Sequence, residues 1–193
     1  MTTGKRQLTA NDWVEGALTA LAAGGPDAVA IEPIAAALGT TKGSAYWHWP
    51  SRRALLIAAL ERWQEVATVG VIEAVETAGG TASERLERLL AITTTTVEER
   101  QGELLILVHP DPDVRAVVSA VTDDRVSYVG RLLVEHGIDP VDAERRAVLA
   151  YAAYLGFVHL AAATPEALPQ AAEARIALQH TLVRLMTSSP NAS

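Results

Sequence analysis

The side chains best suited to chemistry lie between Lys42 and Arg53, where aromatic rings, hydroxyls and cations occur together. The chain holds nine aromatic residues, and three of them, Tyr46, Trp47 and Trp49, fall within four positions. A histidine lies among them, and basic residues flank the run on both sides. This mixture is poorly suited to a hydrophobic core. It favours a surface that lies against a polyanion carrying stacked bases, which indicates nucleic acid.

Catalytic and metal-binding chemistry finds little support in the sequence. There is no cysteine, which excludes disulfides and thiolate metal sites. His109, Asp111 and Asp113 are ligand-type residues, but the two prolines between them predict a rigid corner before a helix, and no second cluster completes a metal shell. No P-loop, G-x-S-x-G or GxGxxG motif occurs. We therefore expect no enzyme activity, no catalytic residue, no metal and no cofactor.

The composition predicts a helical protein with a sizeable core. Of the 193 residues, 49% are apolar, and alanine and leucine dominate them. Residues of this kind favour helices, whereas β-branched runs are sparse. No window reaches the roughly 18 uncharged apolar residues of a membrane span, and no apolar signal core follows the polar N-terminus. The sequence predicts a soluble cytoplasmic protein with no membrane partner.

The net charge of −7 is unusual for a nucleic-acid-binding protein, so its distribution matters. Residues 1–53 hold five Lys and Arg against four acidic residues, whereas residues 54–193 hold eleven against nineteen. The acidic excess therefore lies in the larger C-terminal part. An acidic body with a locally cationic tip keeps non-specific phosphate binding weak and leaves a defined docking face.

Caps and stops place the helices that must position these side chains. The expected N-terminal helices cover residues 9–23, 33–38, 42–48 and 51–77. Gly39 suits the left-handed residue that ends the second helix, and Thr41 and Ser51 are expected to cap the third and fourth. Pro33 is compatible with the first turn of the second helix, and Pro50 stops the third.

The C-terminal helices have similar signals. Thr81 and Glu84 form a capping box that opens a fifth helix, to about residue 99. A short sixth helix is expected from Pro112, and a seventh from residues 122–124 to Gly137. The eighth covers residues 140–163, and the last ends near residue 186 with no clear start. The prediction is an all-α fold of about nine helices, with a three-helix helix-turn-helix module (residues 1–53) joined by the long fourth helix to a C-terminal bundle (residues 54–193).

Residues 34–56 carry a resemblance to a known family. The pattern is Ile34-Ala35-(x)3-Gly39-x-Thr41-Lys42-Gly43-Ser44-x-Tyr46-x-His48-Trp49-Pro50-Ser51-Arg52-x-x-Leu55-Leu56. Ala35 is small where two helices cross, and Gly39 permits the turn between them, as a helix-turn-helix requires. The pattern resembles the tetracycline-repressor (TetR) family of transcriptional regulators. Two departures are conservative: Trp49 replaces the family's usual phenylalanine, and Arg52 its usual lysine.

The resemblance implies a DNA-contacting face. Its residues are Thr40, Thr41, Lys42, Ser44, Tyr46, Trp47, His48, Arg52 and Arg53. Thr41, Lys42, Ser44 and Trp47 would lie near base edges and sugar, and Tyr46, His48 and Arg52 or Arg53 would donate to phosphates. By their spacing, Ala45 and Trp49 belong to the core instead.

Arg52 and Arg53 support a phosphate site without any family knowledge. They lie in the first turn of the fourth helix, where a cation opposes the helix dipole by roughly 0.3–1 kcal/mol. A phosphate at that helix end would be held by both the dipole and the guanidinium, which reverses the penalty. The alternative is that both side chains are merely solvated.

The resemblance also implies that the C-terminal part dimerises and binds a small effector. Candidate pocket residues are polar or aromatic side chains on otherwise apolar helices: Trp63, His109, Tyr128, Tyr154 and His159. The large apolar share favours a hydrophobic effector. Candidate dimer faces on the last two helices are Ala147, Ala150, Tyr151, Tyr154, Leu155 and Val158, and Ile176, Leu178, Leu182 and Leu185. For each of these residues an ordinary place in the core is the alternative.

The sequence thus predicts a ligand-responsive repressor that binds a palindromic operator as a homodimer and leaves it when the effector binds. The alternative is a helical protein-interaction module without DNA binding, in which the aromatic run is a protein hot spot. Salt dependence separates the two, because phosphate contacts weaken steeply with salt.

Overall fold

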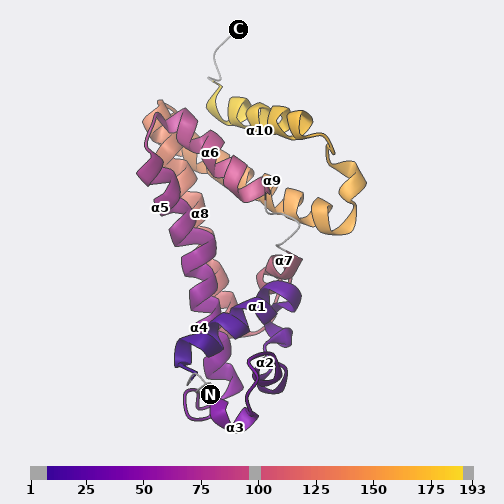
Figure 1. The fold of residues 1–193 in the computed structure, drawn as a ribbon. Coiled ribbons are helices and arrows are strands. Elements are labelled where there is room, and N and C mark those ends of the chain that lie inside the picture. Colours follow the sequence, from indigo (N-terminus) through magenta and orange to yellow (C-terminus); the bar gives the residue numbers. More distant parts are fainter. Residues whose placement is uncertain (1–7, 96–100, 189–193) are drawn as a thin grey trace, which may run out of the picture.

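The computed structural model describes residues 8–95 and 101–188, and these form helices joined by turns, with no strand among them. One end of the molecule contains three helices, α1 (Ala10–Ala28), α2 (Ile31–Ala37) and α3 (Lys42–Ala45). A long helix leads away from them (Figure 1). It consists of α4 (Arg52–Gln64), a π-helical turn η1 (Glu65–Val69) and α5 (Gly70–Ala78).

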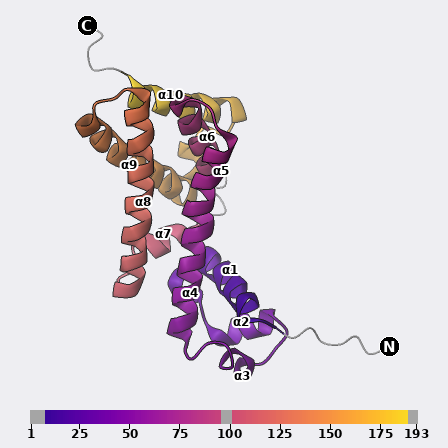
Figure 2. The same ribbon diagram turned by 90° about the vertical axis from the view of Figure 1, so that its left-hand side faces the viewer.

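The remaining helices build the opposite end. They are α6 (Ala82–Thr95), α7 (Gln101–Leu107), α8 (Pro112–His136), α9 (Pro140–Ala163) and α10 (Ala172–Thr187), with a short 3-10 turn at Pro165–Ala167. Figure 2 shows α8 running beside the α4–α5 helix, and α10 lying far from α3. When α4–η1–α5 is counted as one helix, the described residues form nine helices, as predicted.

Several of the predicted helix ends are confirmed. In the capping box before α6, the Thr81 N–H donates to Glu84 Oε2 at 2.7 Å, and the Glu84 N–H donates to Thr81 Oγ1 at 3.3 Å. Asp111 caps α8 through the N–H of Asp113. Gly39 has a φ of 66°, so it occupies the left-handed region that the sequence pattern requires after α2.

The predictions for three helices are wrong. α8 is a single helix, because the side chains near its middle contact other helices instead of capping a new one: Thr122 Oγ1 lies 3.4 Å from the Tyr151 hydroxyl, and Asp124 accepts from Gln64. α7 was not expected, since seven residues are too few to show a helical period. α3 ends at Ala45, and the Thr41 side chain makes no capping hydrogen bond.

The π-helical turn was not expected either. It interrupts the long helix at residues 65–69, where Gly70 N–H bonds back to the Glu65 carbonyl. A π-helical turn inserts one residue into the helical repeat and often marks a functional position. Thr68 of this turn is buried, which is unusual for a hydroxyl among apolar helices.

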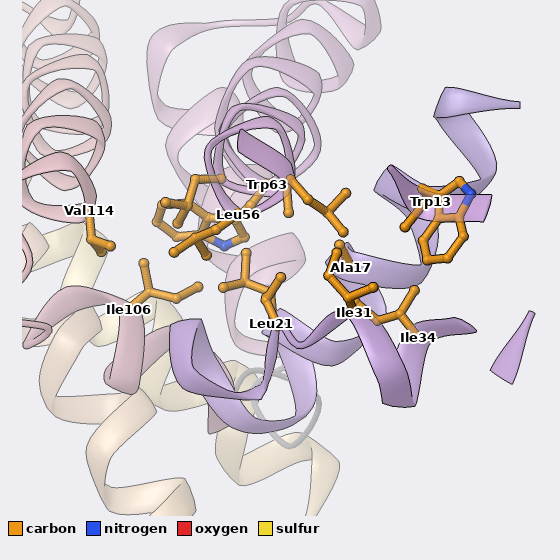
Figure 3. Packing of buried hydrophobic residues seen from close by; sticks show 14 of the residues in the cluster. Trp13, Ala17, Leu21, Ile31, Ile34, Leu56, Trp63, Ile106 and Val114 are labelled. Atoms are coloured by element: carbon orange, nitrogen blue, oxygen red, sulfur yellow. The ribbon is translucent and has the colours of Figure 1, made fainter. Parts of the chain in front are cut away.

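The first hydrophobic core joins the N-terminal helices to the rest of the chain. Figure 3 shows Trp13 and Leu21 of α1 in line with Leu56 and Trp63 of α4 and with Ile106 of α7, all members of one buried cluster. The second core joins α5, α6, α8, α9 and α10. The side chains that pack against the helix-turn-helix therefore come from both sides of the predicted 53/54 boundary.

The contact between α1 and α7 is unusually close. A Cβ atom placed on Gly102 of α7 would lie 2.3 Å from the Ala22 carbonyl oxygen of α1, which is far shorter than real Cβ contacts. Only glycine allows the two backbones to approach this closely. This seam ties the N-terminal module to the C-terminal bundle.

α9 differs from the expected helix in two respects. It is the helix among the described residues that is long and apolar enough to cross a membrane, although length and composition alone are weak support for a span. Only 22% of its apolar window is buried inside the chain. The predicted dimer face of α9 is wrong in part, because Ala147, Ala150, Tyr154 and Val158 are core residues. The exposed apolar residues lie on another face, and include Val141, Val148 and Leu149.

Candidate DNA interface and ligand pocket

The helix-turn-helix is built by α2, a tight turn and α3. After α2, the Gly39 N–H donates to the Ala36 carbonyl at 3.1 Å, and the Thr40 N–H donates to the Ala35 carbonyl at 2.9 Å. Ala45 is completely buried, as predicted, so it holds α3 against the first core. The opposite side of α3 faces solvent at the end of the molecule.

The aromatic residues after α3 point outward. Trp47 is 89% exposed and Tyr46 is 56% exposed, although rings of this size usually lie in a core. Lys42 is also exposed, and its ammonium lies 2.8 Å from Glu32 Oε1 in an exposed ion pair. Trp49 is half-buried and packs against the first core, which confirms its expected place.

The other predicted DNA contacts lie around these residues. Thr41, Arg52 and Arg53 are exposed, whereas Thr40, Ser44 and His48 are half-buried. Roles for all of them at DNA stay predictions. The structure brings the nine residues to one end of the molecule, on α3, the turns before and after it and the start of α4.

The two arginines at the start of α4 already have partners. Arg52 Nε donates to the Val29 carbonyl at 2.6 Å, and its Nη2 donates to the Pro26 carbonyl at 2.7 Å. These bonds fasten α4 to the turn after α1, which the sequence did not suggest. Arg53 pairs with Asp111 and Asp113 at the corner before α8. A phosphate would therefore compete with these partners for part of each guanidinium.

His109 lies in the corner between α7 and α8. Its Nδ1 accepts from the Asp111 N–H at 3.3 Å, and its Nε2 lies 3.6 Å from Asp27 of the α1 segment. The backbone N–H of Asp113 holds the pKa of Asp111 below its ordinary value, so the capping carboxylate stays ionised. The corner therefore caps α8 and connects it to α1 and α4. No group of three His, Cys, Asp or Glu that could hold a metal is found in the described part of the chain.

A cavity of about 70 Å³ lies between the second core and the π-helical turn. Its walls come from η1, α5, α6, α8, α9 and α10, and most lining side chains are apolar. Of the five predicted pocket residues, Tyr128 and Tyr154 line this cavity. Trp63 lies nearby under Arg125, whereas His109 is at the corner just described and His159 is exposed on α9.

Arg125 forms the polar side of the cavity. Its Nη1 donates to Glu103 Oε1 at 2.6 Å, its Nε donates to Thr68 Oγ1 at 3.0 Å, and its Nη2 donates to the Ala67 carbonyl at 3.2 Å. The Tyr154 hydroxyl donates to the other carboxylate oxygen of Glu103 at 3.0 Å. Burial alone would lower the pKa of Arg125, but Glu103 together with Tyr154 and Tyr151 raises the pKa above its ordinary value, so the guanidinium stays charged.

Sequence reasoning missed both members of this ion pair. Arg125 lies in a polar run that was interpreted as a helix start, and Glu103 lies in an unassigned segment. The useful signal was the single acidic residue in the apolar stretch Gly102–Val108, because an acid in such a stretch is buried only with a partner.

A second polar contact borders the cavity at Tyr128. Burial raises the pKa of Tyr128, so its hydroxyl keeps the proton that it donates to Glu76 Oε1 at 2.7 Å. That hydrogen bond lowers the pKa of Glu76, and Arg85 lowers it further. Tyr128 therefore has its hydroxyl directed to Glu76, and its ring forms part of the apolar wall.

An exposed helix-turn-helix at one end of an all-helical chain, with a cavity in the bundle at the other, defines the class of helix-turn-helix transcriptional regulators. Residues 14–59 match the family described as bacterial regulatory proteins, tetR family. The match covers the helix-turn-helix segment, so this N-terminal part of the chain is similar to that of TetR-family transcriptional regulators. No match was found among curated proteins.

Solved structures share the whole fold at low sequence identity. A transcriptional regulator from Rhodococcus sp. Rha1 has a TM-score of 0.76 at 15% identity, covering 95% of this chain and 100% of that one. A tetR-family regulator from Streptomyces coelicolor has a TM-score of 0.65 at 18% identity, covering 92% and 78%. FadR from Bacillus subtilis, solved with stearoyl-CoA, has a TM-score of 0.63 at 14% identity, covering 93% and 98%.

Proposed function

We propose that the protein is a homodimeric repressor that binds a palindromic operator and is released by a small effector. The observation that carries this proposal is the exposure of Trp47 and Tyr46 beside Lys42 at the outer end of the helix-turn-helix. Large exposed rings next to a cation suit contacts with sugars, bases and phosphates.

The DNA face comprises Thr40, Thr41, Lys42, Ser44, Tyr46, Trp47, His48, Arg52 and Arg53. In this proposal Lys42, Ser44 and Trp47 face the major groove, and Tyr46 and His48 donate to phosphates. The start of α4 adds its helix dipole, since Ser51 caps it and no acidic residue lies in its first turn.

Dimerisation is proposed because the helix that would enter the major groove is short. One short helix contacts few base pairs, so two copies spaced along the duplex give usable specificity. The exposed apolar residues of α9 and α10 supply a surface for a second copy: Val141, Val148, Leu149, Ile176 and Leu185. Burial of these faces in a four-helix contact would also account for a long apolar helix with so little of its surface covered.

The effector site is the cavity beside Arg125. Its apolar walls favour a largely hydrophobic compound. Stearoyl-CoA, which is bound to the Bacillus subtilis FadR, is far larger than a cavity of about 70 Å³. We therefore propose a smaller effector for this chain. Release of DNA requires that the effector bind one of two conformations more tightly than the other.

Selection of binding sites from random duplexes tests the proposal. A palindrome with half-sites about 10 base pairs apart is expected, as is a steep fall in affinity with salt. Lys42→Ala is expected to reduce by about 1 the slope of log affinity against log salt concentration, because one phosphate contact is lost. Failure to select any duplex, or salt-insensitive binding, contradicts the repressor and favours the protein-interaction module.

The dimer has its own test. Leu149→Glu with Leu185→Glu is expected to give a monomer in sedimentation, because each charge would be buried in the contact. Val66→Glu, an exposed apolar position on the π-helical turn, is the matched control. A double variant that sediments like the unchanged protein would contradict this interface.

A further inference from the structure

The three cations predicted for the DNA face differ in the groups that hold them. Arg52 donates to two backbone carbonyls, which carry no charge. Lys42 pairs with a carboxylate of α2, inside the same N-terminal module. Arg53 pairs with two carboxylates: its Nη1 lies 3.5 Å from Asp111 Oδ2, and its Nη2 donates to Asp113 Oδ2. The charge of Arg53 is therefore already matched by acidic side chains before any phosphate arrives.

The carboxylates that hold Arg53 come from the C-terminal bundle. Asp113 lies in the first turn of α8, and Asp111 caps that helix. Figure 2 shows α8 running beside the α4–α5 helix, and the middle of α8 lines the cavity at Arg125 and Tyr128. The contact therefore joins the predicted DNA face to a helix that also lines the cavity.

The contact is open enough for Arg53 to change partners. The side chains of Arg53, Asp111 and Asp113 are 56%, 29% and 43% exposed. An ion pair with this exposure changes an equilibrium constant by at most about fivefold. A DNA phosphate carries the same single negative charge as a carboxylate and accepts the same charge-assisted hydrogen bonds from a guanidinium. A phosphate can therefore displace the carboxylates at little cost.

We propose that Asp113, together with Asp111, occupies Arg53 in place of a DNA phosphate, so that the corner before α8 competes with DNA for this guanidinium. The inference rests on the proposed function, because it takes the external phosphates to be those of a bound duplex. Competition weakens DNA binding by the strength of the pair. By linkage, bound DNA weakens the pair by the same factor.

A general effect of charge has to be separated from competition. Removal of any carboxylate close to DNA strengthens binding, because a negative charge repels phosphates over about 10 Å in ordinary buffers. Competition differs from this repulsion because it requires Arg53. Asp27 of α1 offers a matched control at the same corner, since its side chain is 91% exposed and lies 3.6 Å from His109 Nε2. Asp27→Asn removes the same charge and leaves the Arg53 pair in place.

The experiment measures the affinity of the full-length protein for a duplex of about 30 base pairs with random sequence at low salt. Asp113→Asn is expected to bind about threefold more tightly than Asp27→Asn, because it removes both the repulsion and the competitor. Asp111 is left unchanged because its carboxylate caps α8.

The same two substitutions in an Arg53→Met background complete the test. Without Arg53 no competition is left, so Asp113→Asn is expected to gain no more affinity than Asp27→Asn does. A gain from Asp113→Asn that is equal in both backgrounds overturns the proposal, because repulsion alone would then account for it.

Inorganic tripolyphosphate separates this inference from the repressor. It is titrated into the same proteins without DNA and followed by NMR at the Arg53 Nε–H. Saturation is expected at about threefold lower concentration in Asp113→Asn than in Asp27→Asn. That result without duplex binding contradicts only the repressor, whereas duplex binding with equal gains in both backgrounds contradicts only the competition. If no duplex binds and tripolyphosphate acts equally on the two variants, both ideas are overturned.

Discussion

The outer end of the helix-turn-helix and the cavity use the same side-chain types in opposite ways. At the outer end, Lys42 lies near Tyr46 and Trp47, and all three face solvent. At the cavity, Arg125 lies over Trp63 and Tyr154, and all three are largely shielded. In both places a cation accompanies aromatic rings, but only the cavity contains a buried anion that matches its cation.

This difference shows that burial decides whether a cation beside aromatic rings can exchange its partner. An exposed cation loses little when its partner changes, so it can exchange Glu32 for a phosphate. A buried guanidinium cannot lose its partner without a large penalty, so Arg125 comes with Glu103. The exposed cation can therefore take an external polyanion, whereas the buried pair fixes Arg125 in place within the bundle.

The largest expected effect comes from breaking the buried pair. Arg125→Met leaves Glu103 buried without its guanidinium and is expected to lower the free energy of unfolding by about 3–5 kcal/mol. Arg53→Met, which breaks an exposed pair, is expected to cost at most about 1 kcal/mol. Urea unfolding at one fixed protein concentration measures both. Equal losses for the two variants would contradict the contrast between the regions.

The second-largest effect is expected at the close contact between α1 and α7. Gly102→Ala places a methyl group against the α1 backbone at Ala22 and is expected to cost about 1–3 kcal/mol, because neither backbone can move without disturbing the first core. Gly156→Ala on α9 is the control, since nothing lies near its added Cβ. Thermal unfolding measures both, and equal midpoints would show that the seam is not tightly packed.

A smaller effect is expected at the outer end. Trp47→Ala is expected to weaken operator binding about tenfold, or about 1.4 kcal/mol, and to leave the unfolding free energy unchanged because the ring is exposed. Val66→Ala, an exposed apolar residue on another surface, is expected to change neither. Loss of stability in Trp47→Ala would show that the ring is part of the core after all.

The smallest effect concerns pH at the border of the cavity. Hydrogen bonding from Tyr128 lowers the pKa of Glu76 from its ordinary 4.5, so Glu76 contributes stability above that value and loses it as the pH falls through the lowered pKa. Tyr128→Phe is expected to cost roughly 1 kcal/mol at neutral pH and to flatten the fall in stability below pH 4.5. Chemical unfolding at several pH values measures the change. An unaltered pH dependence would contradict the role of this hydrogen bond.

Local signals in the sequence were reliable where one or two residues decide the structure. The left-handed Gly39, the capping box of Thr81 with Glu84 and the cap at Asp111 all depend on neighbours within a few positions. The same signal type failed at residues 122–124, because those side chains find partners on other helices. A cap residue and a cross-helix contact look alike until the neighbouring helix is in place.

By itself, the sequence determined the helical class, the helix-turn-helix and the outward-facing aromatic run. The first follows from composition and the second from the positions of glycine and caps. The third follows because rings on either side of the buried Ala45 cannot all enter the core. Only the tertiary structure decided that Arg52 fastens α4 to the turn after α1, that Arg125 and Glu103 meet, and that the long helix contains a π-helical turn. These features join residues tens of positions apart. Their energies depend on burial, which no local pattern reports.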